Sequence, residues 1–282
     1  MTEIDSGALM EAVWRALVED CAPGDITTRW AVPQDVHVRA RILACQDGVV
    51  AGLHLLAETY RQLDKAVEVT ALVADGDRVQ DGQCLADVSG PARSIITGER
   101  TALNFLQRMS GIATHAAAYV DAVAGYPVRI LDTRKTAPGL RILDKYAVMA
   151  GGAANHRPHL AAMVLVKDNH IAAAGGVGVA VAAVRAHKTP EITIEVEVES
   201  VAQAAEALET EVEWILLDNM SLADMRRVVA MRGASTTRLE ASGNARLEKV
   251  GAIAATGVDA ISVGAITHSA PAFDLTMRLS RS

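Results

Sequence analysis

The second half of the chain alternates short apolar runs with alanine-rich segments of helical character. After Gly125 there are six such runs, each short enough for a buried strand: 128–131, 163–166, 192–196, 214–217, 238–240 and 260–263. Strands that alternate with helices pair in parallel, and a closed or nearly closed barrel hides both edges of the resulting sheet. The pattern therefore predicts a compact α/β barrel.

The first third of the chain has a different pattern, in which one helix precedes alternating strands. Residues 7–19 have one apolar helical face, and 36–45 and 67–73 alternate in the manner of half-buried strands. The segment 75–82 predicts two glycine turns around a short strand. A similar hairpin occurs in domains that carry biotin or lipoate, but those modify a lysine at the hairpin tip, and this segment has none.

A helical pair connects the two halves. Ser94 can cap a helix that runs to Gly111, and a second helix is expected from Ile112 to Ala124. We expect this pair to link a small first domain to the barrel.

Composition and charge narrow the range of partners. A length of 282 residues with 50% hydrophobic positions permits one large core or two modest ones. The formal net charge of −7 argues against a general attraction to nucleic acid or to an anionic membrane, so neither is an expected partner. An anionic ligand would need a local cluster of cations.

The cysteines and the start of the chain predict a cytoplasmic protein. Cys21, Cys45 and Cys84 are odd in number and lack the spacing of metal ligands, so they are expected to be reduced thiols. The first residues lack the pattern of a signal peptide, and no apolar run approaches the roughly 20 residues that span a bilayer.

Polar residues or glycine follow each predicted strand of the barrel. Reacting groups in α/β barrels gather at the carboxyl ends of the strands, so we expect one functional mouth there, formed by 132–135, 167–170, Glu197, 218–219, 242–244 and Gly264. Cations are frequent in and near this set: Arg134, Lys135, His156, Arg157 and Lys167. Such a cluster on an acidic protein suits a multiply anionic small molecule.

Two further features of the mouth point to phosphate and a metal ion. The turns 242–244 and 264–265 follow the last two strands, where barrels commonly bind phosphate. Glu197 and Asp218 each close an apolar run, and their oxygens suit Mg²⁺ shared with substrate phosphates. Alternatively, these carboxylates balance the nearby cations.

Longer motifs contain these residues and extend over nearly the whole chain. They are GDITT at 24–28, TGERTALNFLQRMSGIAT at 97–114, DTRKTAPGLR at 132–141, NHR at 155–157, KDNH at 167–170, LDN at 217–219, LEASG at 239–243 and SVGAITHS at 262–269. In this order the motifs resemble those of the quinolinate phosphoribosyltransferases, also called carboxylating nicotinate-nucleotide pyrophosphorylases.

The resemblance implies a fold and an assembly. The expected fold is an open α/β sandwich domain at 1–111, to which a C-terminal helix at 270–282 returns, joined to the incomplete α/β barrel of type II phosphoribosyltransferases at 112–269. The expected assembly is a homodimer or a higher homo-oligomer, in which the sandwich domain of one subunit covers the barrel mouth of another.

The resemblance also implies a reaction. A phosphoribosyl group would pass from phosphoribosyl pyrophosphate (PRPP) to quinolinate with loss of carbon dioxide, with Mg²⁺ as cofactor. The products would be nicotinate mononucleotide and pyrophosphate, in de novo NAD biosynthesis.

The same resemblance assigns roles to individual residues. The quinolinate site would contain Arg134, His156, Arg157 and Lys167, together with Arg100 from the neighbouring subunit. The PRPP site would contain Lys135, Glu197, Asp218, Ser242, Gly243, Gly264 and His268. Direct catalytic roles would fall to Lys135, Lys167, Glu197 and Asp218, of which Glu197 and Asp218 would also hold Mg²⁺.

Three departures from common family forms concern loops rather than charges. Asn244 and Ala153 stand where glycine is frequent, and Pro158–His159 follows Arg157. These residues put the details of the phosphate loop and of the Arg157 segment in question, and leave the charged set intact.

Three other functions fit parts of the pattern. A related phosphoribosyltransferase of the same architecture could use nicotinate or belong to the molybdenum-associated branch. A Schiff-base aldolase could use Lys167 as nucleophile, since a strand-end lysine among apolar neighbours can have a lowered pKa. A barrel of this kind could also bind quinolinate without turnover.

Overall fold

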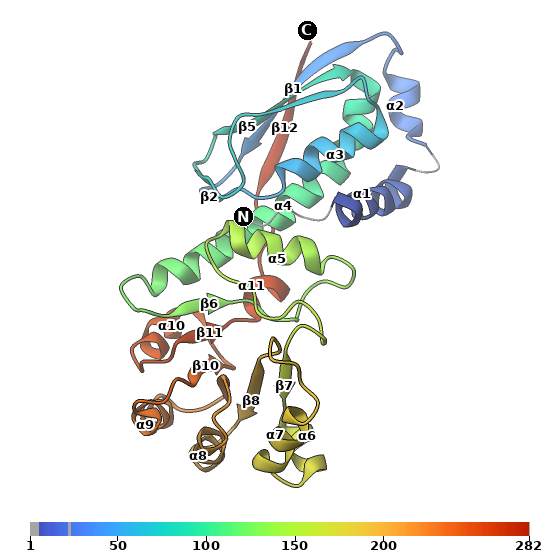
Figure 1. Ribbon diagram of the computed structural model, residues 1–282. Coiled ribbons are helices and arrows are strands. Elements are labelled where there is room, and N and C mark those ends of the chain that lie inside the picture. The colour runs from blue at the N-terminus through green and yellow to red at the C-terminus, as the bar shows by residue number, and fades with distance from the viewer. Residues whose placement is uncertain (1–5, 22–23, 282) are drawn as a thin grey trace. The chain divides into compact units, whose positions relative to one another are not determined.

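The computed structural model describes residues 6–21 and 24–281. The chain forms two compact units (Figure 1). The first unit comprises Met1–Ala117, Thr136–Gly152 and Ile266–Ser282, and the barrel unit comprises Ala118–Lys135 and Ala153–Ala265. In the described part of the chain, no helix is both long and apolar enough to cross a membrane.

The first unit contains a four-stranded antiparallel sheet in the order β12-β1-β5-β3. Its strands are β1 (His37–Ala44), β3 (Glu68–Ala71), β5 (Cys84–Pro91) and β12 (Leu275–Arg281). A two-stranded ribbon pairs β2 (Gly48–Val49) with β4 (Arg78–Val79), which confirms the short strand expected within 75–82. Four helices accompany the strands: α1 (Ser6–Cys21), α2 (Ile26–Ala31), α3 (Leu53–Leu63) and α5 (Arg141–Ala150).

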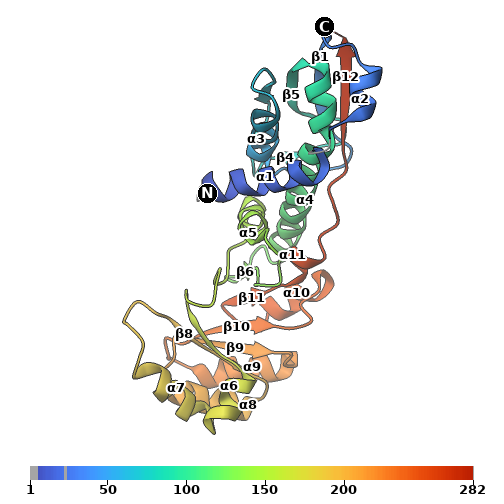
Figure 2. The same cartoon turned by 90° about the vertical axis from the view of Figure 1, so that its right-hand side faces the viewer.

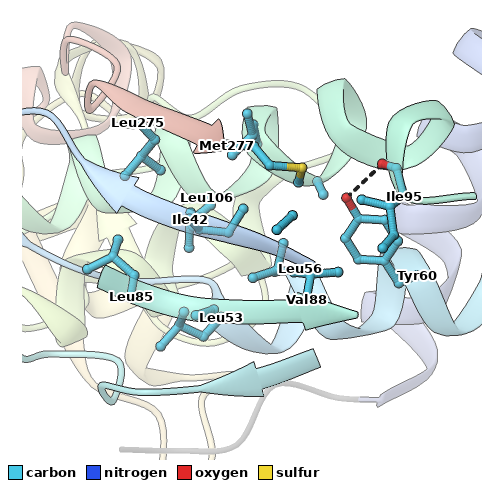
Figure 3. Packing of buried hydrophobic residues seen from close by; sticks show 14 of the residues in the cluster. Ile42, Leu53, Leu56, Tyr60, Leu85, Val88, Ile95, Leu106, Leu275 and Met277 are labelled. Atoms are coloured by element: carbon cyan, nitrogen blue, oxygen red, sulfur yellow. Dashed lines mark hydrogen bonds between the residues drawn. The ribbon is translucent and has the colours of Figure 1, made fainter. Parts of the chain in front are cut away.

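Strand β1 lies at the centre of the core of this unit. Alternate residues Val38, Ala40, Ile42 and Ala44 are buried, as the period of a strand with one covered face requires. Figure 3 shows Ile42 among apolar side chains from α3, β5 and β12. The Tyr60 hydroxyl, which is also buried there, donates a hydrogen bond of 3.1 Å to the Ile95 carbonyl, so its one polar atom is satisfied.

The C-terminal segment is a strand, and the helix predicted at 270–282 is wrong. Strand β12 pairs antiparallel with β1, and Ala44 lies opposite Leu275 while Ile42 lies opposite Met277. Leu275 and Met277 are buried and Arg278 is exposed, a period of two that places the apolar side chains on the core. The segment returns to the first unit as an edge strand.

One long helix replaces the predicted pair. Helix α4 runs without interruption over Ala92–Ala122, and it begins in the first unit and ends in the barrel unit. Gly111 lies inside this helix rather than at its end. A Cβ at this position would lie only 2.1 Å from the Pro271 carbonyl oxygen of the returning chain, so there is no room for a side chain. Ser94 lies within the helix rather than capping it, and its hydroxyl donates to the Asp64 carboxylate.

The barrel unit contains six parallel strands in the order β6-β11-β10-β9-β8-β7. All six runs predicted as strands are confirmed: β6 (Arg129–Leu131), β7 (Val164–Val166), β8 (Ile194–Val198), β9 (Trp214–Asp218), β10 (Arg238–Ser242) and β11 (Ala260–Ser262). Glu197 lies inside β8 instead of after it. The order leaves β6 and β7 unpaired with each other, which confirms the incomplete barrel.

Helices connect the barrel strands from β7 to β11. They are α6 (Asp168–Ala174), α7 (Val177–Arg185), α8 (Val201–Glu209), α9 (Leu222–Arg232) and α10 (Leu247–Ala254), and the short α11 (Ala265–His268) follows β11. Helix α8 contacts α7, α9, β8 and β9. Figure 2 shows α7, α8 and α9 grouped below β8 and β9 in that view.

A short segment extends the sheet beyond β6. Ala154 forms a parallel bridge with Leu131, in which the Ala154 N–H donates to the Ile130 carbonyl and the Asp132 N–H donates to the Ala154 carbonyl. The segment that carries His156 and Arg157 is thereby fixed to the free edge of β6.

Gly111→Ala should destabilise the protein by about 1 to 3 kcal/mol, because the added methyl group must displace the Pro271 backbone. Urea unfolding would measure the change. Gly178→Ala on α7 is the matched control, since the nearest atom to a Cβ there lies at 3.8 Å and alanine favours a helix. Equal stabilities of the two variants would contradict the close packing at Gly111.

Candidate active site

All six strands of the barrel deliver predicted site residues to its carboxyl edge, called here the barrel mouth, and Glu197 lies near the end of β8. Arg134 and Lys135 follow β6, Lys167 follows β7, and Gly264 follows β11. Asp218 and Ser242 are the last residues of β9 and β10 and lie opposite each other in the parallel register. The residues expected at the strand ends therefore lie along one edge of the sheet.

Lys167 and Glu197 form an ion pair across neighbouring strands. The Lys167 ammonium contacts Oε2 of Glu197, and about two fifths of the lysine side chain is exposed (43%). The glutamate side chain is largely buried. This pair holds the ammonium at the mouth, where part of its surface is available to a ligand.

The loop after β10 is built on two asparagines. Asn219 and Asn244 have positive φ values of 53° and 51°, a conformation that asparagine tolerates better than most residues. The Asn219 N–H donates to the Ser242 carbonyl at 3.0 Å, and the Asn244 amide donates to Oδ1 of Asn219 at 3.1 Å. Asn244 can therefore occupy a position where glycine is frequent in the family.

Gly243 has no room for a side chain. Its φ is +80°, and a Cβ would lie 2.2 Å from Oδ1 of Asn219. The backbone of the loop therefore lies directly against the asparagine that follows β9.

Arg134 and Arg157 form a pair of neighbouring cations. Burial lowers the pKa of Arg157, and the positive charge of Arg134 lowers it further. The Arg157 guanidinium donates to the Met163 carbonyl at 2.9 Å. Two close guanidinium groups repel each other, so an anion between them is electrostatically favoured.

His156 is held by protein groups at both ring nitrogens. The Arg157 N–H donates to Nδ1 at 2.7 Å, so the ring proton is on Nε2, which lies 3.0 Å from Oε2 of Glu195. The His156 N–H in turn donates to Oδ1 of Asp132 at 2.7 Å, and Asp132 is fully buried.

Glu195 and Glu240 are buried carboxyl groups inside the barrel, with 1% and 2% of their surface exposed. Burial raises the pKa of Glu195 to about 7, against the opposing effect of Arg157. Burial and the neighbouring Glu195 raise the pKa of Glu240 to about 8. The two carboxyl groups therefore retain at least one proton between them near neutral pH.

Two groups of side chains could be considered for a metal ion. The ligand atoms of His156, Glu195 and Glu240 lie within 4.8 Å of one another. Because Nε2 of His156 carries the ring proton, it is a donor and not a metal ligand, so this group does not fit.

Glu197 and Asp218 fit Mg²⁺ better. Glu197 uses one carboxylate oxygen for Lys167, and Asp218 uses one for the Asn219 amide at 2.8 Å, so each has a second oxygen outside these bonds. Hard oxygen ligands on neighbouring strands match the preference of Mg²⁺ for carboxylates combined with substrate phosphates.

Two predicted site residues belong to the first unit. Arg100 is exposed on α4 and borders a cavity of about 540 Å³, together with Glu11, Arg15 and Arg108. His268 is exposed at the end of α11, and its Nδ1 lies 2.6 Å from the Ser269 hydroxyl.

The structural roles of Glu195, Glu240 and Asp144 were not predicted from the sequence. Glu195 and Glu197 are two residues apart in an otherwise apolar strand, so both point into the barrel, and this spacing was the available signal. Asp144, fully buried on α5, accepts two bonds from Arg108 and one from the Ala137 N–H. It fixes the loop that follows Lys135.

Nearly the whole chain matches the two domains of one protein family. Residues 25–110 match the N-terminal domain of quinolinate phosphoribosyl transferase, and residues 112–278 match its C-terminal domain. The chain belongs to the quinolinate phosphoribosyltransferase family. The family resemblance predicted from the motifs, and the class of activity that it implied, are thereby confirmed.

Individual members of the quinolinate phosphoribosyltransferase family are similar over nearly full length. Identity is 44% over 285 residues to the nicotinate-nucleotide pyrophosphorylase (carboxylating) of Mycobacterium leprae, covering 99% of this chain and 100% of the relative. It is 43% over 267 residues to a probable enzyme of that name from Synechocystis, covering 94% and 90%. The crystal structure of NadC from Streptococcus pyogenes superimposes with a TM-score of 0.96 at 37% identity and covers 100% of both chains.

The other departures from common family forms are also accommodated. Ala153 is not among the non-glycine residues with positive φ, so an alanine is unstrained there, while the preceding Gly152 has φ +85°. Pro158 and His159 are exposed, next to Arg157.

The free energy of unfolding should fall as the pH rises from about 5 to 8. The pKa of Glu240 is raised in the folded state, so its contribution is fully present below the unfolded pKa and is lost as the pH rises through the folded pKa of about 8. Glu240→Gln should flatten this slope, as urea unfolding at several pH values would measure. An unchanged slope in the variant would contradict the raised pKa.

Proposed function

We propose that the barrel mouth carries out the decarboxylating transfer of a phosphoribosyl group from PRPP to quinolinate, the reaction of its family in NAD biosynthesis. The observation that carries this proposal is the cation set of Arg134, Arg157 and Lys167 beside the carboxylates Glu197 and Asp218. Two dicarboxylate-binding guanidinium groups and two oxygen ligands for a phosphate-bound metal ion suit these two substrates.

The cations bind the pyridine dicarboxylate. Arg134 and Arg157 repel each other, and one carboxylate between them relieves that repulsion. Lys167 supplies a further positive charge, and Arg100 of a neighbouring subunit a fourth. Lys135 and His156 lie between the two substrates in this assignment, with His156 contributing its ring surface because both ring nitrogens bond to protein.

The carboxylates and the late loops bind PRPP. Glu197 and Asp218 bind the ribose hydroxyls and would hold Mg²⁺, which would supply positive charge to stabilise the departing pyrophosphate. The 5-phosphate lies at Ser242, Gly243 and Gly264, with His268. The lack of room for a side chain at Gly243 supports a close approach of backbone N–H groups to phosphate.

Catalysis follows mainly from orientation and charge. The ring nitrogen of quinolinate attacks the anomeric carbon, and the bond to pyrophosphate breaks with its electron pair. The nitrogen then carries a positive charge, which stabilises the electron pair left on the adjacent carbon when the carboxylate leaves as carbon dioxide. A proton takes the place of that carboxylate.

The alternative Schiff-base reaction is disfavoured by the surroundings of Lys167. Its contact with Glu197 suits an ammonium ion, whereas a Schiff base requires a neutral amine.

We further propose a homodimer or a higher homo-oligomer with shared sites. Arg100 is exposed at a cavity of the first unit that contains charged residues of both signs, and this surface would cover the mouth of a neighbouring subunit. The cytoplasm is the proposed compartment, since Cys21, Cys45 and Cys84 are free thiols. A tobacco relative is named as mitochondrial, and an Arabidopsis relative as chloroplastic.

Purified protein with quinolinate, PRPP and Mg²⁺ should release carbon dioxide and form nicotinate mononucleotide, while nicotinate in place of quinolinate should give no product. Removal of Mg²⁺ by a chelator should stop the reaction. Lys135→Ala should lower kcat/KM by about 100-fold or more, and Lys65→Ala, which changes an exposed lysine of the first unit, should not. Turnover of nicotinate alone would refute the proposed substrate.

Mixing two inactive variants should restore part of the activity if sites are shared. Arg100→Ala and Lys167→Ala remove residues that different subunits contribute to one site, so a hybrid dimer retains one intact site of two. Random exchange makes about half of the dimers hybrids, so the mixture should reach about a quarter of the activity of the unmodified enzyme. The matched control mixes Lys135→Ala with Lys167→Ala, which should stay inactive because both residues belong to the same barrel unit. Failure of the first mixture, with subunit exchange verified by mass spectrometry, would refute the shared site.

A further inference from the structure

The positive charge of Arg157 can bind a substrate only if no neighbouring carboxylate already forms an ion pair with it. Glu195 is close enough to Arg157 for their charges to interact, and a buried carboxylate would be expected to attract the guanidinium. Among the described residues, however, no ion pair joins the two, and the guanidinium bonds to the Met163 carbonyl instead.

The carboxylate of Glu195 is directed to His156 instead. Oε2 of Glu195 lies 3.0 Å from Nε2 of His156, and Oε1 of Glu240 lies 3.7 Å from the same nitrogen. The opposite ring nitrogen accepts the Arg157 N–H at 2.7 Å. A continuous chain of contacts therefore runs from the buried carboxyl pair through the imidazole to the Arg157 backbone.

Packing alone does not fix the imidazole ring. A cavity of about 160 Å³ borders it, and the same cavity is lined by Glu195, Glu240, Arg129 and Trp214. Because a cavity borders one side of the ring, the contacts of both ring nitrogens contribute to its orientation.

We propose that Glu195 and Glu240 are positioning residues for the acid substrate: they fix the ring of His156, which fixes Arg157 with its guanidinium directed to a substrate carboxylate. The pair has a second effect. Because Glu195 contacts His156, it forms no ion pair with Arg157, and the positive charge of Arg157 stays available to a substrate. This inference rests on the proposed role of Arg157 in binding quinolinate. It assigns to the barrel interior a part in substrate affinity, although neither carboxylate touches the substrate.

The test first compares two substitutions of Glu195 in steady-state kinetics with both substrates varied. Glu195→Met keeps the size of the side chain and removes the acceptor, and it should raise the KM for quinolinate roughly tenfold, as loss of a supporting hydrogen bond typically does. The KM for PRPP should change by less than about twofold. Glu195→Gln retains an acceptor for His156 and should stay within about threefold of the unmodified enzyme.

Separate controls test whether the variants fold and whether loss of a nearby negative charge alone changes the KM values. Glu195→Met leaves the Nε2–H of His156 without its acceptor, so the variant is expected to be less stable but folded, as a thermal unfolding transition above the assay temperature would verify. Glu240→Met offers a second variant with an expected rise in the same direction. Glu199→Gln, at an exposed position after the same strand, should leave both KM values unchanged.

The decisive comparison repeats Glu195→Met in an Arg157→Ala background. If Glu195 acts through Arg157, the second substitution should produce no further rise in the KM for quinolinate. A full additional rise, or an equal loss for both substrates, would overturn the positioning role. If Arg157→Ala alone leaves that KM unchanged, the assignment of Arg157 to the substrate fails first, and the positioning role is overturned with it.

Discussion

Parallel pairing in the barrel sheet is the constraint on which the site depends. Because all six strands run in the same direction, their carboxyl ends must lie along one edge, and residues far apart in the chain become neighbours there. The register places Asp218 opposite Ser242, and the Lys167–Glu197 contact joins two adjacent strands. A slip of one residue in any of these pairs would turn a site residue toward the helices.

The mouth places cations beside carboxylates. Lys167 is paired with Glu197, while Arg157 lies close to Arg134 and to the carboxyl group of Glu195, which contacts His156. The net negative charge of the whole chain does not prevent the binding of an anion at the mouth. Charges a few ångströms apart interact more strongly than distant charges that are screened by solvent.

The sequence predicted the barrel better than the first unit, for physical reasons. Buried parallel strands are continuous apolar runs, so all six were found. The terminal segment at Leu275 has only a few alternating residues, and its partner β1 is so distant in the chain that local pattern could not predict the pairing. Gly111 looked like a helix end, but its role is to admit another part of the backbone.

The site was predictable in part. Strand ends indicated Arg134, Lys167, Asp218 and Ser242, whereas the roles of Arg100 and His268 followed only from resemblance to a family. Glu195 and Glu240 were missed because charged residues within a strand usually face solvent. In this protein the curved sheet of the barrel has an inner face, and both side chains are buried there.

The return of β12 to the first unit has a consequence for biosynthesis. Arg39 and Ser280 are neighbours although 241 positions separate them in the chain. During synthesis β1 therefore has a partner on only one side until residues 275–281 have emerged, and its other edge is open to pairing with foreign strands. The barrel strands precede β12 in the chain, so the barrel can form while the sheet of the first unit still has an open edge that β12 covers only later.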